Sequence, residues 1–208
     1  MSVWVESPTE ATFIHLEKTG GTSVELWLND NTTSHRVGKH SSYDKMSKWC
    51  RNNNKSMGLV FSIIRNPFER ELSWYMYFLQ KTKFRLDWAK KGLPDSFLEN
   101  KIQKKYNIEK NQEILKEFNS NAGFKKMITE SSSISPQYHA VKQCNLILRL
   151  ENINQDFKQI STFFKSKNNL PHMNKSKHDH YTTYFDDELK ELVYEKHKID
   201  FDQFGYKF

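Results

Sequence analysis

The sequence has few cysteines and no long apolar run, and each absence excludes a class of protein. The two cysteines, Cys50 and Cys144, lie far apart in a chain of 208 residues. This spacing fits free thiols in a reducing compartment better than a disulfide scaffold, although it leaves a single bridge open. No run of eighteen apolar residues is present, so the sequence predicts no transmembrane helix.

The start of the chain also lacks a targeting segment. Residues 1–6 have neither the basic region nor the apolar region of a signal peptide. The sequence contains no internal repeat and no low-complexity linker. We therefore expect a soluble, cytoplasmic protein with a single domain spanning residues 1–208.

Aromatic residues and positive charge are abundant. Fifteen Phe, nine Tyr and five Trp bury a large area per residue, which indicates a packed globule. The net charge of +7 implies an anionic partner. A solvated basic surface, a nucleotide with several phosphates and an acidic glycan all agree with it, and charge alone does not choose between them.

The most informative stretch is a short apolar strand followed by a glycine pair. Residues 12–16 are apolar and β-branched, which predicts a buried strand. The residues after Glu17 are Lys18, Thr19, Gly20, Gly21, Thr22 and Ser23. The glycines let backbone amides approach an anion, and Thr22 or Ser23 can begin a helix whose positive end binds it. The pattern predicts a phosphate-binding loop, but a lysine before the glycines disfavours a kinase or GTPase.

A second strand leads into a helix at Arg65. Residues 59–64 form a continuous apolar run, typical of a strand buried in a parallel sheet. Asn66 is a suitable helix cap and Pro67 a suitable first helical residue. Ser73 is a polar exception two turns into this helix, which is otherwise apolar through Leu79 and is expected to be largely enclosed.

Together these motifs resemble those of sulfotransferases that use 3′-phosphoadenosine 5′-phosphosulfate (PAPS). The loop after the first strand is similar to the family's 5′-phosphosulfate loop, and residues 15–22 are especially similar to heparan sulfate 6-O-sulfotransferases. Residues 65–73 resemble the family's 3′-phosphate motif. The resemblance extends to residues 145–157 and 200–206 and is faintest between 81 and 133.

The resemblance implies a set of site residues. Lys18 would contact the bridging oxygen of PAPS and act in catalysis. The 5′-phosphate and sulfonate would be bound by Lys18, Thr19, Gly20, Gly21, Thr22 and Ser23. Arg65 and Ser73 would bind the 3′-phosphate, to which a guanidinium fork is well suited. The family needs no metal, and its acceptor would be a hydroxyl group, here of a carbohydrate.

The transfer also needs a general base, for which histidine is the natural candidate because it titrates near neutral pH. We expect His40 to be this base. It precedes a helix that Ser41 or Ser42 can cap, and residues 39–43 resemble the segment that carries a histidine base in several glycan sulfotransferases. Glu17 is the reserve candidate, and His15 is expected to be packed.

The repeated order of strand, loop and helix predicts the fold class. We expect an α/β protein with a three-layer, P-loop-like fold: a central parallel sheet flanked by helices, with the ligand at the carboxyl ends of the strands. Residues 145–150 are expected to be a third strand leading into a helix from 151 to 164, and residues 186–196 a final amphipathic helix. Arg70, Arg149 and Glu151 are expected to be structural.

The resemblance also bears on location. Animal relatives that act on glycans are typically Golgi enzymes with a membrane anchor. This chain starts a few residues before its first predicted core strand, so we expect a microbial or viral cytosolic enzyme.

Two rival functions remain open at this point. A nucleic-acid-binding protein would use the positive charge and aromatics such as Trp88 and Tyr106 among lysines. A P-loop kinase would need a Walker B aspartate, and none clearly ends a strand.

Two basic segments are ambiguous: residues 101–105 form either an acceptor contact or a solvated helix face, and Lys175 or Ser176 either closes over the nucleotide or belongs to an ordinary loop.

Overall fold

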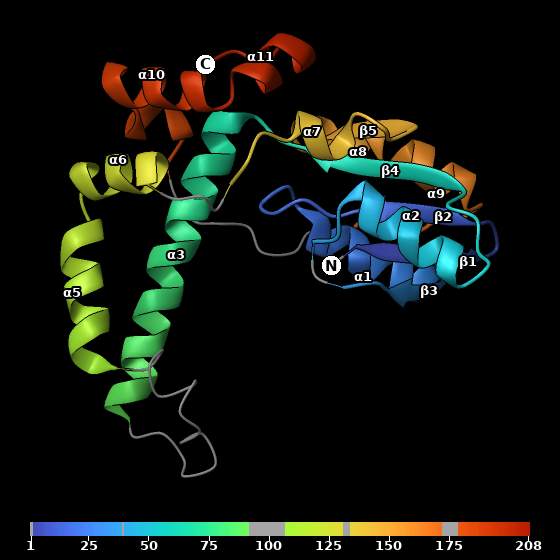
Figure 1. The fold of residues 1–208 in the computed structure, drawn as a ribbon, viewed down its shortest axis with the longest axis horizontal. Helices are drawn as coiled ribbons and strands as arrows, with labels where there is room; N and C mark the ends of the chain where they lie inside the picture. Colours follow the sequence, from blue (N-terminus) through green and yellow to red (C-terminus); the bar gives the residue numbers. More distant parts are fainter. Residues whose placement is uncertain (1, 39, 92–106, 131–133, 172–178) are drawn as a thin grey trace.

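The computed structural model describes the chain except residues 1, 39, 92–106, 131–133 and 172–178. Its centre is a five-stranded sheet with the strand order β3-β1-β2-β4-β5 (Figure 1). The strands are β1 Val3–Ser7, β2 Ala11–Ile14, β3 Thr33–Arg36, β4 Leu59–Ile64 and β5 Leu146–Arg149. The expected α/β fold with a central sheet flanked by helices is therefore confirmed.

The sheet is mixed rather than purely parallel as expected. β2, β4 and β5 pair in parallel, whereas β1 is antiparallel to both of its neighbours, β2 and β3. The reason is the connection from β1 to β2. Three residues separate these strands, and a parallel connection needs a crossover of a dozen residues or more.

Helices cover both faces of the sheet. Val3 and Val5 of β1 share one core with Trp27 of α1 (Gly21–Asn31) and with residues of α8 (Ile153–Asp156) and α9 (Lys158–Phe163). Trp4, which points to the other face, packs with Met46 of α2 (Tyr43–Asn52). This alternation of side chains along a strand produces the three layers.

A long helix, α3 (Pro67–Lys90), leads away from the sheet, and other helices lie along one side of it and near the end where it begins (Figure 1). They are α5 Ile108–Phe118, α6 Asn121–Glu130, α10 Asp187–Lys196 and α11 Lys198–Phe204. A separate apolar core joins the first half of α3 to α6, α10 and α11. The helix continues well beyond Leu79. Its first half packs in this core as expected, whereas Phe84 and Trp88 in the second half, for which no helix was expected, are exposed.

The predicted helix starts agree well with the structure. Ser42 caps α2, and Asn66 caps α3 with Pro67 in the first turn. Asp186 caps α10. The helix expected from residue 151 is instead broken into the 3-10 turn η2 (Leu150–Asn152), α8 and α9. Two short elements, α7 (Tyr138–Val141) and η3 (Tyr181–Tyr184), were not anticipated.

Both cysteines are free in the structure. Cys50 is buried in the core beneath α2, and Cys144 is half-buried beside it. Burial raises the pKa of the Cys144 thiol to about 12, so it is not a reactive thiolate at neutral pH. In the described part of the chain, no helix combines the length and apolarity that crossing a membrane would require.

Candidate active site

The two predicted motifs lie at the same edge of the sheet. β2 and β4 pair in parallel, with Ile14 opposite Ser62, so the segments that follow them leave the sheet side by side. The hydroxyl of Ser62 donates a hydrogen bond to the carbonyl oxygen of Ile14 at 2.7 Å. The structure therefore brings the loop at Lys18 and the junction at Arg65 together, as the sequence predicted.

Two arginines of the second motif hold the backbone of the first. The Arg65 guanidinium donates to the carbonyl oxygen of Lys18 at 3.4 Å. The buried Arg70 donates to the carbonyl oxygens of Glu17 at 2.9 Å and Ser135 at 2.8 Å. Burial lowers the pKa of Arg70 to about 10, which leaves it charged at neutral pH. Arg70 is thus structural, as expected, and acts through two backbone carbonyl groups.

The loop between β2 and α1 is tightly turned. Lys18 and Gly20 both have left-handed backbone conformations, with φ of 64° and 79°. This conformation costs a non-glycine residue about 1 kcal/mol, and such residues cluster at functional sites. The Thr19 hydroxyl donates to the carbonyl oxygen of Leu16 at 3.0 Å and the residue is buried, so this hydroxyl stabilises the loop in the free protein. The role of Thr19 as a nucleotide ligand stays a prediction.

The first turn of α1 is not capped by a side chain. The helix begins at Gly21 rather than at Thr22 or Ser23, its N-cap residue Gly20 supplies no side-chain acceptor, and no acidic residue lies in its first turn. Side chains do cap the other long helices α2, α3, α5 and α10, through Ser42, Asn66, Asn107 and Asp186. The start of α1 therefore keeps amide groups available for an anion. Thr22 is exposed beside it and Ser23 is buried.

His15 explains why residue 21 is a glycine. Its imidazole Nδ1 lies 2.5 Å from the carboxylate of Glu25 on α1, and its ring stacks on Phe13. A Cβ atom at position 21 would lie 2.2 Å from this ring. His15 is buried, as predicted, and fixes the end of β2 against the start of α1.

The side chain of Lys18 crosses from the loop to α3. Its ammonium nitrogen lies 4.3 Å from the centre of the Tyr77 ring, a cation-π contact. The pKa of Lys18 is lowered to about 8, chiefly by burial and further by the nearby charge of Arg65, while Glu17 opposes both effects. Because Lys18 is partly desolvated, its charge interacts more strongly with a nearby anion than it would in water.

The two candidate bases face each other. Nε2 of His40 lies 3.6 Å from the Glu17 carboxylate, and both side chains are partly exposed. Nδ1 of His40 lies 3.3 Å from the carbonyl oxygen of His15. A carbonyl oxygen only accepts hydrogen bonds, so Nδ1 carries the hydrogen and Nε2 is the nitrogen that can take a proton. His40 also has a left-handed backbone, with φ of 50°.

The Arg65 side chain is paired within its own motif. Its Nε donates to Glu69 at 3.1 Å, and 14% of its side chain is exposed. Ser73 lies two turns further along α3 and is buried. In the free protein Arg65 is therefore paired with Glu69, and its role as a phosphate ligand stays a prediction.

Sequence reasoning missed the residues that support the second motif. The Gln137 side chain contacts both backbone polar groups of Arg65, and Asp200 of α11 accepts a hydrogen bond from the backbone N–H of Gln137 at 2.8 Å. Glu151 accepts from the backbone amide of Asn66 at 2.5 Å. Of these residues, the sequence pointed only to Glu151, through its likeness to the family segment.

A cluster of charged side chains is buried between α3 and the junction of α10 with α11. Nε2 of His197 lies 2.6 Å from the Glu71 carboxylate, and Lys196 lies 3.0 Å from the same oxygen. Nδ1 of His197 lies 3.6 Å from Asp200, too far for a hydrogen bond. The group links α11 to α3 and therefore to the second motif.

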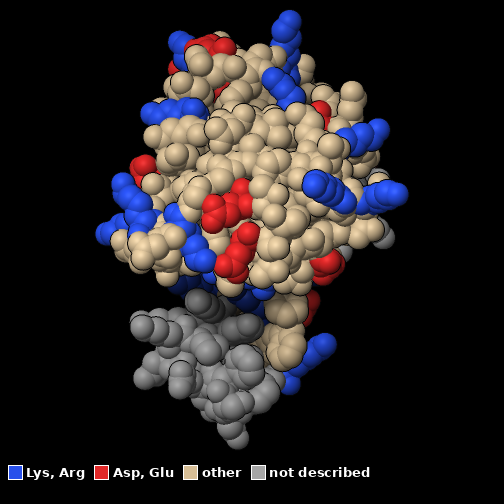
Figure 2. Space-filling view, turned by 90° about the vertical axis from the view of Figure 1, so that its right-hand side faces the viewer, with Lys and Arg blue, Asp and Glu red and all other residues tan. Residues whose placement is uncertain are grey.

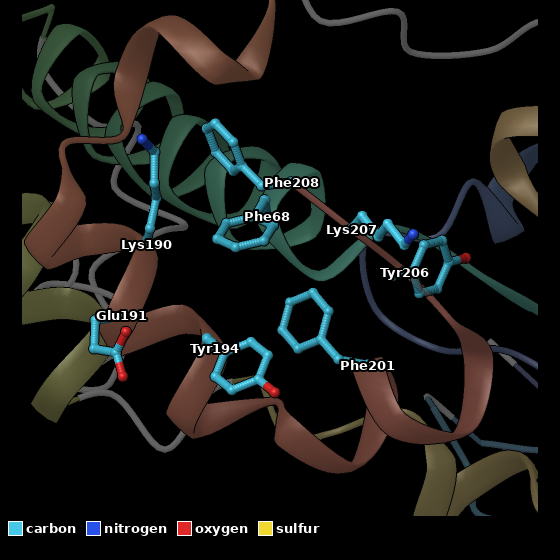
Figure 3. A pocket seen from close by; sticks show the side chains of 8 residues that line it. All are labelled: Phe68, Lys190, Glu191, Tyr194, Phe201, Tyr206, Lys207 and Phe208. Carbon is cyan, nitrogen blue, oxygen red and sulfur yellow. The ribbon is translucent and has the colours of Figure 1, made fainter.

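A pocket of about 310 Å³ near the carboxyl terminus is separate from these residues (Figure 3). Its lining residues are Phe68, Lys190, Glu191, Tyr194, Phe201, Tyr206, Lys207 and Phe208. The aromatic rings of Phe68 and Phe208 meet edge to face, with centres 4.9 Å apart. None of the predicted site residues lines this pocket, so it is not the expected nucleotide site.

Three predictions fall on residues that the structure does not describe. Residues 101–105 and Tyr106 lie outside the described part of the chain, as do Lys175 and Ser176.

Comparison with known proteins agrees with this geometry. No curated protein matches the sequence. A family model described as the sulfotransferase family matches residues 4–207, a range that includes both motifs and nearly the whole chain. The chain therefore belongs to the sulfotransferase family.

Proposed function

We propose that this protein transfers a sulfuryl group from PAPS to a hydroxyl group of a carbohydrate. The observation that carries the proposal is the contact between the Arg65 guanidinium and the Lys18 carbonyl oxygen. It joins the two motifs at one edge of the sheet, so that a single nucleotide can use the loop for its 5′ end and Arg65 for its 3′-phosphate.

The residues present fit such a nucleotide. The uncapped start of α1 and the turned loop before it offer backbone amides to the 5′-phosphate and sulfonate. Arg65 offers a fork of N–H donors to the 3′-phosphate, in exchange for its bond to Glu69. Ser73, on the same helix, is proposed as a second ligand of that phosphate.

The chemistry follows from charge and position. PAPS supplies an activated sulfuryl group whose bond to the phosphate oxygen breaks as a bond to the acceptor oxygen forms. Nε2 of His40 takes the proton of the acceptor hydroxyl, and the Glu17 carboxylate at 3.6 Å stabilises the imidazolium that results. The Lys18 ammonium stabilises the negative charge that develops on the leaving phosphate oxygen. As in phosphoryl transfer, alignment and charge stabilisation do most of the work.

The first test is calorimetric titration with 3′-phosphoadenosine 5′-phosphate and with the analogue that lacks the 3′-phosphate. We expect the first to bind more tightly. Equal binding of the two nucleotides would contradict the proposal. Tighter binding of ATP, in a magnesium-dependent way, would contradict it as well and would favour a kinase. The second test is incubation with labelled PAPS and a panel of carbohydrates, lipid-linked glycans and small alcohols, read by mass spectrometry. Label on the non-carbohydrate acceptors alone would contradict the acceptor class.

The rival nucleic-acid function receives less support from the structure. On the face shown in Figure 2, Lys and Arg side chains are scattered among acidic and neutral ones instead of gathered in one patch. Nucleic-acid binding leaves the uncapped helix start and the Arg65 contact without a purpose. Preference for oligonucleotides over the 3′-phosphorylated nucleotide in the same titration would reverse this conclusion.

A further inference from the structure

A row of aromatic and basic side chains runs along α3 from Lys18. Tyr77, Lys81, Phe84 and Trp88 follow one another at spacings of four, three and four residues, which places them on one face of the helix. We call these four residues the α3 stripe. Its first member contacts Lys18, and the Lys81 ammonium lies 3.2 Å from the Tyr77 hydroxyl. The stripe therefore begins at the proposed site of transfer.

The stripe has no part in packing α3 against α5. The opposite face of α3 performs that role: the Tyr75 hydroxyl donates to the carbonyl oxygen of Phe118 at 2.7 Å, and the Phe78 and Phe118 rings are 5.4 Å apart. Thr82 and Leu86 continue that buried face. In Figure 1, α5 and the sheet lie on opposite sides of α3. The stripe thus faces away from α5.

The stripe is unusually apolar for an exposed surface. Phe84, Trp88 and Tyr77 are 52%, 42% and 38% exposed. They make up three of the six large apolar side chains that are exposed in the described part of the chain. The Phe84 and Trp88 rings are 5.8 Å apart and form a continuous aromatic surface. Aromatic side chains that gather at the surface mark a binding site more often than scattered ones do.

The charge around the stripe indicates an anionic ligand. The second half of α3 carries five basic residues with the C-cap, Lys81, Lys83, Arg85, Lys90 and Lys91, and one acidic residue, Asp87. Tyr77 and Trp88 are eleven positions apart, a distance of about 16 Å along a helix. A ligand that uses the whole stripe must therefore be elongated as well as acidic.

We propose that the α3 stripe binds an elongated, acidic saccharide as the acceptor chain, with its reactive hydroxyl at Lys18. This inference rests on the proposed function and specifies its substrate class. The aromatic rings would contact the apolar C–H faces of successive sugars, and the basic residues would contact their acidic groups. Single-stranded nucleic acids and anionic membranes also bind aromatic and basic surfaces, but an acceptor chain is the ligand that must extend outward from Lys18.

The test measures binding of unsulfated chondroitin oligosaccharides, which are carboxylated, in a short and a long form. We expect the wild type to bind the long form more tightly than the short one. The double variant Phe84→Ala/Trp88→Ala should raise the Kd of the long form by about tenfold and leave the short form and 3′-phosphoadenosine 5′-phosphate unchanged. Tyr194→Ala is the control, because Tyr194 is an aromatic residue on α10 that is 40% exposed. Lys81→Ala should weaken binding of the long form in a salt-dependent way. Its control is Lys48→Ala, because Lys48 is an exposed lysine on α2.

Several outcomes would overturn the inference. They are failure of the long form to bind the wild type, equal loss in the Tyr194→Ala control, and equal binding of neutral maltooligosaccharides. A stripe-dependent preference for an oligonucleotide or for anionic vesicles would assign the stripe to those ligands instead. The result is independent of the nucleotide titration: a wild type that does not bind 3′-phosphoadenosine 5′-phosphate contradicts the proposed function, whereas saccharide binding measures the stripe directly.

Discussion

The side-chain amide of Gln137 pairs with both backbone polar groups of Arg65. Its oxygen accepts from the Arg65 N–H at 2.9 Å, and its nitrogen donates to the Arg65 carbonyl oxygen at 2.8 Å. Gln137 is 1% exposed and is itself held by Asp200. The position of the proposed 3′-phosphate ligand thus depends on residues far along the chain.

Replacing Gln137 by leucine should therefore lower both the stability of the fold and its affinity for the nucleotide. Two backbone groups of Arg65 would lose their partner, at a cost of about 1–3 kcal/mol for an unsatisfied buried group. We expect a lower free energy of unfolding in urea and a weaker affinity for 3′-phosphoadenosine 5′-phosphate in calorimetry. Gln112→Leu, at an exposed position on α5, is the control. Unchanged nucleotide affinity would show that Gln137 does not position Arg65.

Arg65→Ala should weaken binding of the 3′-phosphorylated nucleotide far more than binding of the analogue without that phosphate. The physical reason is the loss of charge-assisted hydrogen bonds, which contribute about 1.5–3 kcal/mol each. Calorimetry on both ligands measures the difference. Glu69→Gln, which frees Arg65 from its ion pair, should instead strengthen the 3′-phosphorylated ligand. Equal weakening of both ligands in Arg65→Ala would mean that Arg65 is purely structural.

Lys18→Ala should bind the nucleotide but lose most of its turnover. Removing such a charge stabiliser costs ~3 kcal/mol, on the order of a hundredfold in rate. Because the pKa of Lys18 is about 8, kcat/KM should fall as the pH rises through that value and the ammonium loses its proton. Lys18→Arg keeps the charge at higher pH and should move this fall upward. A wild-type profile that stays flat above pH 8, or near-normal turnover in Lys18→Ala, would remove Lys18 from the mechanism.

Much of the candidate site was predictable because its parts are local. A strand, a turn and a helix start are adjacent in sequence, so the loop at Lys18 and the cap at Asn66 can be recognised from neighbouring residues. The joining of the two motifs also followed, because parallel strands bring their carboxyl ends to one edge. The bond from the Thr19 hydroxyl to the Leu16 carbonyl oxygen within the loop was not anticipated.

The remainder depends on contacts between distant residues. The pairing of Gln137 with Arg65 has no local signal, since it joins residues 72 positions apart. The direction of β1 was missed because the first residues of the chain were not interpreted as a strand. The extension of α3 to Lys90 was missed because exposed aromatics such as Phe84 do not follow the apolar pattern of a packed helix.

The buried group around His197 should make stability depend on pH. Burial alone would lower the pKa of His197, but Asp200 and Glu71 outweigh it and raise the pKa above 6.5. The folded state thus holds this proton more tightly, so its contribution is complete below about pH 6.5 and is lost as the pH rises through the raised pKa. The pKa of Glu71 is lowered, against the effect of burial, by His197 and Lys196, so its contribution is lost in acid.

His197→Gln should therefore be less stable than the wild type near pH 6, by about 3–5 kcal/mol for a broken buried pair. The free energy of unfolding of the wild type should decline above neutral pH, and this decline should be absent in the variant. Urea unfolding at several pH values measures both effects, with the exposed His180→Gln as control. A variant that keeps the wild-type pH dependence would show that folding does not shift the pKa of His197.

The last prediction decides between the two candidate bases, whose side chains lie 3.6 Å apart. If Nε2 of His40 takes the proton, His40→Ala should keep its nucleotide affinity and lose ~100-fold or more in transfer, the usual contribution of a general base. It should also lose the acidic limb of the pH profile, because no imidazole remains to be protonated. Glu17→Gln removes the charge that stabilises the imidazolium, which lowers the pKa of His40. Its acidic limb should therefore persist and move to lower pH. Profiles of the wild type and both variants, measured side by side, test this sign. An acidic limb that survives in His40→Ala and vanishes in Glu17→Gln would make Glu17 the base and His40 its partner.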